Sequence, residues 1–292
     1  MSALRGLEHR HTPWLEARIA ADPARHAFLA SLLDTAGTAA VAQPSGTLLG
    51  YFRGGDPVAA YWMGGSIIAL EPTCESNAAA AAHLNARGRA SCSLIGEAPA
   101  VLDLHERLAW GRPLGVRPEQ PLLQARAAPA VEPAEGVRVG TVADLEETFP
   151  ASVAMFTEEV GFSPIEHGAA GYRSRVRSLL AAGSTYLITA ARGPDGAPVR
   201  RWPARDRDEQ VVFKADLGIR SPAAVQVQGV WVHPDFRGAG LGARAMAAVT
   251  AHVRERVSPV VTLYVNDYNV AARRTYARAG YEQIGTFATV MY

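Results

Sequence analysis

A glycine-rich stretch near the C-terminus has the residue types of a binding site for a phosphorylated ligand. Residues 224–232 (AVQVQGVWV) are apolar enough for a buried strand, and they are followed by HPDF and by RGAGLG at 237–242. The run 243–256 has the apolar spacing of a helix. The first N–H groups of a helix have no partner within it, and that end carries positive dipole charge. Glycines let a phosphate approach this backbone closely, so we expect an anion site that suits a diphosphate.

The same stretch also matches the relaxed dinucleotide fingerprint G-x-G-x-x-A in the segment GAGLGA. Three features oppose that interpretation. The polar segment HPDFR separates the strand from the first glycine, and the strand at 260–265 is followed by Asn266 rather than an acidic residue. Only 50 residues follow Gly242, too few for the remaining strands of a dinucleotide domain. A tight loop without a ligand does not explain Arg237 beside three glycines, so we favour a coenzyme site.

Two ordered motifs in this region resemble those of the GNAT N-acetyltransferase superfamily. The pattern V-x-P-x-x-R-G-x-G-x-G resembles its acyl-CoA-binding motif and occurs here as Val232, Pro234, Arg237, Gly238, Gly240 and Gly242. A downstream pattern is similar to N-x-x-A-x-x-x-Y-x-x-x-G-F, with Tyr in the last place: Asn269, Ala272, Tyr276, Gly280 and Tyr281. The resemblance covers about 137–292. The phrases MFTEEVGFSP, GVWVHPDFRGAGLG and LYVNDYN are also similar to a two-domain, actinobacterial-type group with an uncharacterised N-terminal domain.

The resemblance implies acetyl-CoA as cosubstrate, no metal, and direct attack of a neutral amine on the acetyl thioester. The amine would belong to a small molecule or a peptide. The family fold implies a mixed sheet splayed between two strands, with the pantetheine arm in the gap. Backbone amides of the splayed strand, at Val230, Trp231 and Val232, can stabilise the oxyanion. The residues that it implies for holding the coenzyme are Arg237, Gly238, Ala239, Gly240, Leu241, Gly242, Asn269 and Tyr276.

Tyr276 is our candidate for the acid that protonates the departing thiolate. It lies seven residues after Asn269, about two helical turns, so both side chains project from one helix face. On that face Asn269 would bind the pantetheine amides. The ordinary pKa of tyrosine, ~10, lies above the ~8.5 of a thiol, so the transfer is assisted rather than complete. Without the motif, a tyrosine packed on an amphipathic helix would be the preferred interpretation.

The general base is not defined by the motif. Many family members place a glutamate nine or eleven residues before the arginine, where this chain has Gln228 and Gln226. An amide does not accept a proton at working pH. Glu158 and Glu159, at a helix end on the substrate side, are our catalytic candidates, and a solvated helix end is the alternative. Three other groups are weaker candidates: His167, which is expected to be exposed, His233, expected to be structural, and the carboxylate of Tyr292.

Two domains are expected, at 1–125 and 137–292, joined by the Pro- and Ala-rich linker RAAPAVEPAEG at 126–136. The first is a smaller α/β domain without a second R-x-x-G-x-G. We expect it to be non-catalytic, and its strand–hairpin–helix order is compatible with a degenerate half of the same fold. The second is α/β (α+β) with the GNAT fold. The segment GPDGAPVRRWPARDRDEQ at 193–210 is expected as an exposed, mobile loop.

Composition excludes several other classes. Charged residues make up 20% and the net charge is +1, which gives no electrostatic footprint for nucleic acid. No apolar run reaches the ~18 residues of a membrane span, so we expect a cytoplasmic protein. Cys74 and Cys92 are too far apart for a zinc motif, and we expect them to be buried thiols. A homodimer is compatible with the sequence. The alternative functions are a tandem acyltransferase of small-thiol metabolism, like mycothiol synthase, and a non-catalytic acyl-CoA sensor.

Overall fold

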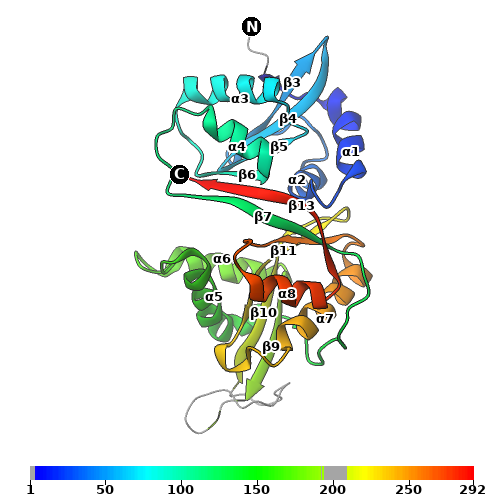
Figure 1. Ribbon diagram of the computed structural model, residues 1–292, viewed down its shortest axis with the longest axis vertical. Helices are drawn as coiled ribbons and strands as arrows, with labels where there is room; N and C mark the ends of the chain where they lie inside the picture. The colour runs from blue at the N-terminus through cyan, green and yellow to red at the C-terminus, as the bar shows by residue number, and fades with distance from the viewer. Residues whose placement is uncertain (1–3, 192, 194–208) are drawn as a thin grey trace. The chain divides into compact units, whose positions relative to one another are not determined.

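The same order of strands and helices occurs twice along the chain. The computed structural model describes residues 4–191, 193 and 209–292 (Figure 1). The first series runs β1 (Leu4–Gly6), α1 (Thr12–Ala21), α2 (Ala27–Ala36), β3 (Gly46–Arg53), β4 (Asp56–Gly64), β5 (Ser66–Leu70), α3 (Cys74–Arg87), β6 (Ser93–Glu97), α4 (Ala98–Glu106) and β7 (Gly115–Ala125). The second runs β8 (Arg138–Val139), α5 (Leu145–Val160), α6 (Ala170–Ala181), β9 (Thr185–Ala191), β10 (Glu209–Arg220), β11 (Val225–Val232), α7 (Leu241–Arg256), β12 (Val261–Tyr264), α8 (Val270–Arg278) and β13 (Tyr281–Met291).

Strand pairing repeats along with the order. In the first series β1–β3, β3–β4 and β4–β5 pair antiparallel, and β5–β6 pair parallel across the helix α3. The second series has antiparallel β8–β9, β9–β10 and β10–β11, followed by parallel β11–β12 across α7. A parallel pair needs such a crossover, whereas antiparallel neighbours need only a short turn. The expected α/β fold with a mixed sheet is therefore confirmed, and its topology occurs in both halves of the chain.

The chain forms two compact units that do not follow chain order. The first comprises Met1–Leu123, Tyr264–Asn269 and Gln283–Tyr292, and the second comprises Gln124–Leu263 and Val270–Glu282. Most of β13, the closing strand of the second series, therefore lies in the first unit. There it pairs antiparallel with β6, from Phe287 opposite Glu97 to Met291 opposite Ser93.

In the first unit, helices cover both faces of the sheet. Side chains alternate between the faces along a strand. Leu48 and Trp62 pack with the helical residues Leu15 and Leu29 of α1 and α2. Their neighbours Leu49 and Tyr61 pack with α3 and α4 instead. Ala288 and Val290 of β13 belong to this second cluster, so the end of the chain contributes to the core of the first unit.

In the second unit, α7 has the apolar face that its spacing predicts. Leu241, Ala245, Val249 and Val253 are at most 1% exposed. They recur every four residues, which brings them to one side of the helix. This burial holds the start of α7 against the sheet, directly after the glycine-rich segment.

The segment 126–136 runs along the second unit and contains no helix or strand. Its backbone N–H groups donate to the second unit: Arg126 and Ala127 to Gly280 O, Ala130 to Arg278 O and Ala134 to Arg244 O. These bonds fix its path over that unit. Most of the expected loop at 193–210 lies outside the described residues.

The structure corrects one expectation of the sequence. Cys74 and Cys92 are exposed free thiols rather than buried ones. Cys74 is the first residue of α3, directly after the N-cap Thr73, and Cys92 lies just before β6. Both positions are at the ends of elements, where the core does not cover the side chain.

Candidate active site

The glycine-rich segment forms an open helix N-terminus. After β11, a short 3-10 turn (Pro234–Phe236) leads to Arg237, and α7 begins at Leu241 with Gly240 as its N-cap. Gly240 has no side chain that could cap this helix, and no other described residue is seen to cap it. Gly238 and Gly240 have φ of +76° and +81°, a backbone conformation that favours glycine. The first N–H groups of α7 are thus left for a ligand, as an anion site requires.

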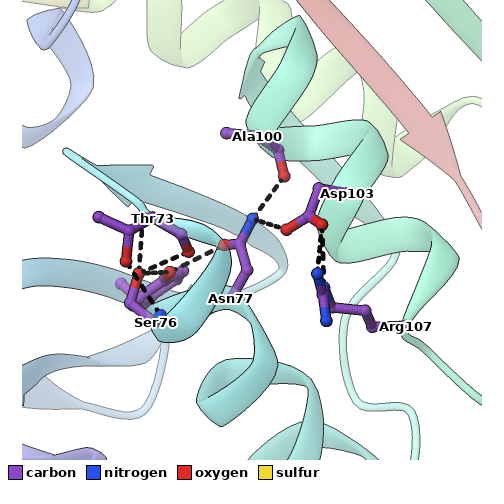
Figure 2. A network of polar contacts seen from close by, with 7 residues as sticks. Thr73, Ser76, Asn77, Ala100, Asp103 and Arg107 are labelled. Atoms are coloured by element: carbon purple, nitrogen blue, oxygen red, sulfur yellow. Dashed lines mark hydrogen bonds and ion pairs between the residues drawn. The ribbon is translucent and has the colours of Figure 1, made fainter.

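The corresponding place in the first series is closed by side chains. There β5 is followed by Glu71, Pro72 and Thr73, and the Thr73 hydroxyl accepts a bond from Ser76 N at 3.1 Å, which caps α3. Figure 2 shows the network that continues from this cap. Asn77 Nδ2 donates to Ala100 O at 2.9 Å and to Asp103 Oδ2 at 2.8 Å, while Arg107 binds Asp103 at 2.6 Å. The start of α3 therefore lacks the open amides and the glycines found at the start of α7.

Arg237 is held by an acidic residue from another element. Its Nη2 donates to both carboxylate oxygens of Glu158, at 3.0 and 2.8 Å, and its Nε donates to Val232 O at 2.9 Å. Trp231 Nε1 donates to the same carboxylate at 3.3 Å. Glu158 lies in the last turn of α5, so this contact connects α5 to the glycine segment. One candidate base is therefore an ion-pair partner of the predicted coenzyme-binding arginine.

Glu159, the other candidate base, contributes to the environment of two tyrosines. Its negative charge raises the pKa of Tyr276 and of Tyr172, in each case as a smaller cause than burial. Glu159 and Tyr276 thus belong to one electrostatic neighbourhood in the second unit. Glu158 and Glu159 are adjacent in sequence but have different surroundings.

Tyr276 is a buried residue of α8. Its side chain is 8% exposed, and its ring packs against Tyr281 with the centroids 5.9 Å apart. Burial raises its pKa well above the ordinary value of 10.0, and the nearby Tyr281 and Glu159 add to the rise. The hydroxyl is accordingly protonated at neutral pH, the state that a proton donor needs.

β11 leaves its parallel neighbour before it reaches the glycine segment. The pairing of β11 with β12 joins Val225 to Val261 and Gln226 to Thr262. β11 continues from there to Val232. Residues Val230, Trp231 and Val232 lie on this continuation, where the sequence predicts the oxyanion donors.

Four other residues that the sequence singles out lie outside the Arg237–Glu158 pair, and each has its own surroundings. His233 Nδ1 accepts from Asp235 N at 3.3 Å and caps the 3-10 turn, and burial lowers its pKa. His167 lies exposed between α5 and α6. Asn269 directly precedes α8, and its N–H donates to Asn266 O at 3.0 Å. The Tyr292 hydroxyl lies 2.7 Å from His105 Nδ1, and its ring contacts Trp110, all within the first unit.

One polar cluster was not predicted from the sequence. Lys214 of β10 is fully buried, and its Nζ donates to Asp216 Oδ2 at 2.6 Å. The same Nζ donates to Gly229 O at 3.0 Å, and Thr185 Oγ1 donates to Asp216 Oδ1 at 2.8 Å. The signal in the sequence was present, because Lys214 is the only lysine of the chain. Its position within an apolar strand marks it as buried.

Comparison with known families gives two adjacent matches. Residues 46–148 match the model described as "Domain of unknown function (DUF4081)". Residues 177–281 match that of the "Acetyltransferase (GNAT) family". This second match contains β11, the glycine segment, α7 and Tyr276. Among curated proteins, none matches the chain.

The structural similarity to solved proteins of the same fold covers nearly the whole chain. A protein from Drosophila has a TM-score of 0.63 at 12% identity, covering 100% of this chain and 99% of that one. A GCN5-related N-acetyltransferase from Sphaerobacter thermophilus has a TM-score of 0.55 at 16% identity, covering 99% and 94%. A GNAT-family acetyltransferase from Colwellia psychrerythraea has a TM-score of 0.54 at 11% identity, covering 99% of both chains. At these identities the similarity concerns the fold alone.

The described residues contain neither a helix that could span a membrane nor a cluster that could bind a metal ion. None of the helices in residues 4–191, 193 and 209–292 has both the length and the apolar character needed to cross a bilayer. The same part of the chain contains no group of three or more His, Cys, Asp or Glu residues that could hold a metal ion.

Proposed function

We propose that the protein, an acyltransferase that carries a GNAT acetyltransferase domain, transfers the acetyl group of acetyl-CoA to a primary amine. The acceptor is a small molecule or the amino group of a peptide. The proposal depends above all on the start of α7. An uncapped helix N-terminus, preceded by two glycines with positive φ and by Arg237, has the features that a diphosphate requires.

The contacts of Gly240 support this assignment. A Cβ built on Gly240 would meet only the Arg278 guanidinium, at 3.8 and 3.9 Å, and one built on Gly238 would meet nothing within 4 Å. The left-handed backbone favours glycine at 238 and 240, and the open space beside them is compatible with a ligand. At Gly242, by contrast, a Cβ would lie 3.3 Å from Thr275 and Val232.

The reaction is a direct transfer in which no acetyl-enzyme forms. The amine nitrogen attacks the carbonyl carbon of the thioester, so that a C–N bond forms and the carbonyl oxygen becomes an oxyanion. The backbone N–H groups at Val230–Val232 donate hydrogen bonds to that oxygen. The C–S bond then breaks and coenzyme A leaves as the thiolate. The amine loses one proton, and the thiolate gains one.

We assign the two proton transfers to different groups. Tyr276 donates to the thiolate, because it occupies the tyrosine position of the motif and its hydroxyl carries a proton at neutral pH. Glu159 accepts the amine proton through a water molecule. We prefer Glu159 to Glu158, because Glu158 is bonded through both its oxygens to Arg237. In this proposal Glu158 holds Arg237 in an ion pair that competes with the coenzyme for the guanidinium group.

The N-terminal domain is proposed to be non-catalytic. Its counterpart of the glycine segment is the capped turn at Thr73, where the N–H groups of Thr73 and Ser76 are bonded within the chain. We retain 1–125 and 137–292 as the two domains of the sequence and 126–136 as their connection. The cytoplasm, where acetyl-CoA and free amines occur together, is the proposed location.

The experiment that tests the function measures release of the coenzyme A thiol from acetyl-CoA. The protein is incubated with and without a panel of amines comprising alkylamines, amino sugars, amino acids and peptides with free N-termini. Release that depends on an amine supports the proposal. Binding of acetyl-CoA without release for any amine would instead identify an acyl-CoA sensor, and the substitution of glutamine at 226 and 228 is the observation that favours this second candidate.

A further inference from the structure

The only lysine of the chain lies in the core of the second unit. Of the 29 Lys and Arg residues, 28 are arginine, so the choice of lysine at 214 departs from the composition of the whole chain. Its side chain is fully buried. Lysine presents a compact ammonium group with three donors on a flexible stem, whereas arginine presents a larger planar fork. The site therefore suits a single nitrogen that binds several oxygens at once.

Lys214 Nζ connects two strands through such bonds. It donates to Asp216 Oδ2 on its own strand β10 at 2.6 Å, and to the carbonyl of Gly229 on β11 at 3.0 Å. Asp216 is held in turn by the Thr185 hydroxyl at 2.8 Å. A buried charge needs a partner, and Asp216 supplies it. The bond to Gly229 is additional, and it fixes a backbone group of β11.

The carbonyl that Lys214 binds belongs to a β-bulge. Lys214 is opposite Trp231 and Asp216 is opposite Gln228, so two residues of β11 face the single residue Ala215 of β10. Gly229, the first of these two, has φ of +58°. A Cβ at this position would lie 2.9 Å from Asp216 Oδ2 and 3.3 Å from Lys214 Nζ. The glycine, the bulge and the ion pair thus form one arrangement.

We propose that the buried Lys214–Asp216 pair positions the Gly229–Val230 peptide group for acyl transfer. The C=O and N–H bonds of a trans peptide group point in opposite directions. Because the carbonyl of Gly229 is held by Lys214, the N–H of Val230 is directed away from the ion pair. Val230 is the first of the residues to which the proposed function assigns the oxyanion. This inference rests on that function, and Lys214 acts through the backbone without touching the substrate.

The test compares variants that keep the core filled but change the bond to Gly229. Lys214→Met combined with Asp216→Val replaces the ion pair by apolar side chains, which proteins often tolerate. Lys214→Arg keeps the charge but changes the geometry of the hydrogen-bond donors. It provides the test if the double variant does not fold. Leu180→Ala is the matched control, because Leu180 is 2% exposed and lies in the separate cluster of Leu145 and Val176. Each protein is assayed well below its own melting temperature.

Two measurements separate positioning from stability. With the best amine of the panel, kcat should fall about 10²-fold in both Lys214 variants, the loss typical of one oxyanion donor, and stay within about threefold in Leu180→Ala. The second measurement is the ratio of the Kd values for free coenzyme A and acetyl-CoA by calorimetry. The wild type should bind acetyl-CoA about three- to tenfold more tightly, because the acetyl carbonyl accepts a hydrogen bond. This preference should disappear in the Lys214 variants, while the Kd for free coenzyme A stays the same.

The results that would contradict the positioning role of Lys214 differ from those that would contradict the proposed acetyl transfer. A wild type that transfers acetyl groups, with Lys214 variants that retain both kcat and the affinity ratio, would overturn the positioning role alone. A loss of kcat that Leu180→Ala reproduces at equal loss of melting temperature would overturn it too. A wild type that binds acetyl-CoA but acetylates no amine would overturn the proposed function, and this inference with it.

Discussion

Tyr276 is the residue to which we assign the proton that the thiolate gains. Burial raises its pKa, and the charge of Glu159 adds to this effect. Tyr276→Phe keeps the ring packed against Tyr281 and removes only the hydroxyl. We expect kcat to fall about 10²-fold, with the Kd for acetyl-CoA little changed. Steady-state kinetics and calorimetry check this.

Tyr186→Phe is the matched control for that change. Tyr186 is another buried tyrosine of the second unit, at 2% exposure, and its ring contacts His252. Loss of its hydroxyl should leave kcat within about twofold. If both variants are equally active, Tyr276 is a packing residue.

The raised pKa of Tyr276 also predicts a pH dependence. A phenol whose pKa lies above 10.0 stays protonated as the pH rises towards that value. Loss of the donor should therefore cause no decrease in kcat between about pH 7 and 10. A pH profile of kcat measures this directly. A decrease centred near pH 8 that is absent in Tyr276→Phe would contradict the assignment.

Glu158 and Glu159 are adjacent in sequence, but we expect their replacement by glutamine to have different effects. Glu158→Gln frees Arg237 from a half-exposed ion pair, and such pairs contribute at most about 1 kcal/mol. We expect acetyl-CoA to bind about two- to fivefold more tightly, with the shape of the pH profile unchanged. Glu159→Gln should remove an ionisation from the profile of kcat/KM, which then follows the amine alone at about tenfold per pH unit. If the two single variants and the double variant all keep the wild-type profile, neither residue is the base.

The residue types of the site could be predicted from the sequence, but the residues that they contact in the fold could not. Arg237 and the glycines are recognisable from spacing, since the chemistry lies in consecutive residues. The pairing of Arg237 with Glu158 spans 79 residues of the chain. It depends on how α5 packs against β11, which local spacing does not encode. The contact of Lys214 with Gly229 depends likewise on strand register.

Among the elements, the turn that begins α7 carries the coenzyme site. Gly240→Ala places a side chain on a backbone with φ of +81°, which costs about 1 kcal/mol. Gly183→Ala, between α6 and β9, creates comparable strain at φ of +60° away from the glycine segment. Both should lower the melting temperature similarly. Only Gly240→Ala should weaken acetyl-CoA binding, and calorimetry that shows equal affinity for both variants would remove the site from this turn.

The bounds of helices and strands follow from the sequence where the spacing of apolar residues and the turn residues agree. The apolar, β-branched run at 185–191 predicts a strand, which β9 confirms, and a glycine at 37 predicts the end of a helix, where α2 ends with Gly37 in a left-handed conformation. Residues 115–125 form β7 although Pro118 and Pro121 fall within it, and proline argues against a strand. Tertiary pairing overrides that local preference. The exposed cysteines were missed because their residue type is usually buried.

At the scale of the whole molecule, the end of the chain belongs to the first unit. Gln283–Tyr292 are part of that unit, where β13 pairs with β6. We therefore expect the fragment 126–292 to lack a partner for its last strand and to expose an unpaired edge. Thermal unfolding and gel filtration should show lost cooperativity or aggregation for this fragment. A fragment that unfolds cooperatively as a monomer would show that β13 does not need the first unit.

The proposed transfer of an acetyl group from coenzyme A to an amine can be followed directly by labelling that group. Acetyl-CoA labelled with a heavy isotope in the acetyl group is incubated with the full chain and each amine of the panel, and the products are analysed by mass spectrometry. We expect an amide product that carries the label, in an amount equal to the free coenzyme A released, and its loss in Gly240→Ala. Label found only in acetate, or retained in acetyl-CoA with every amine, would contradict it.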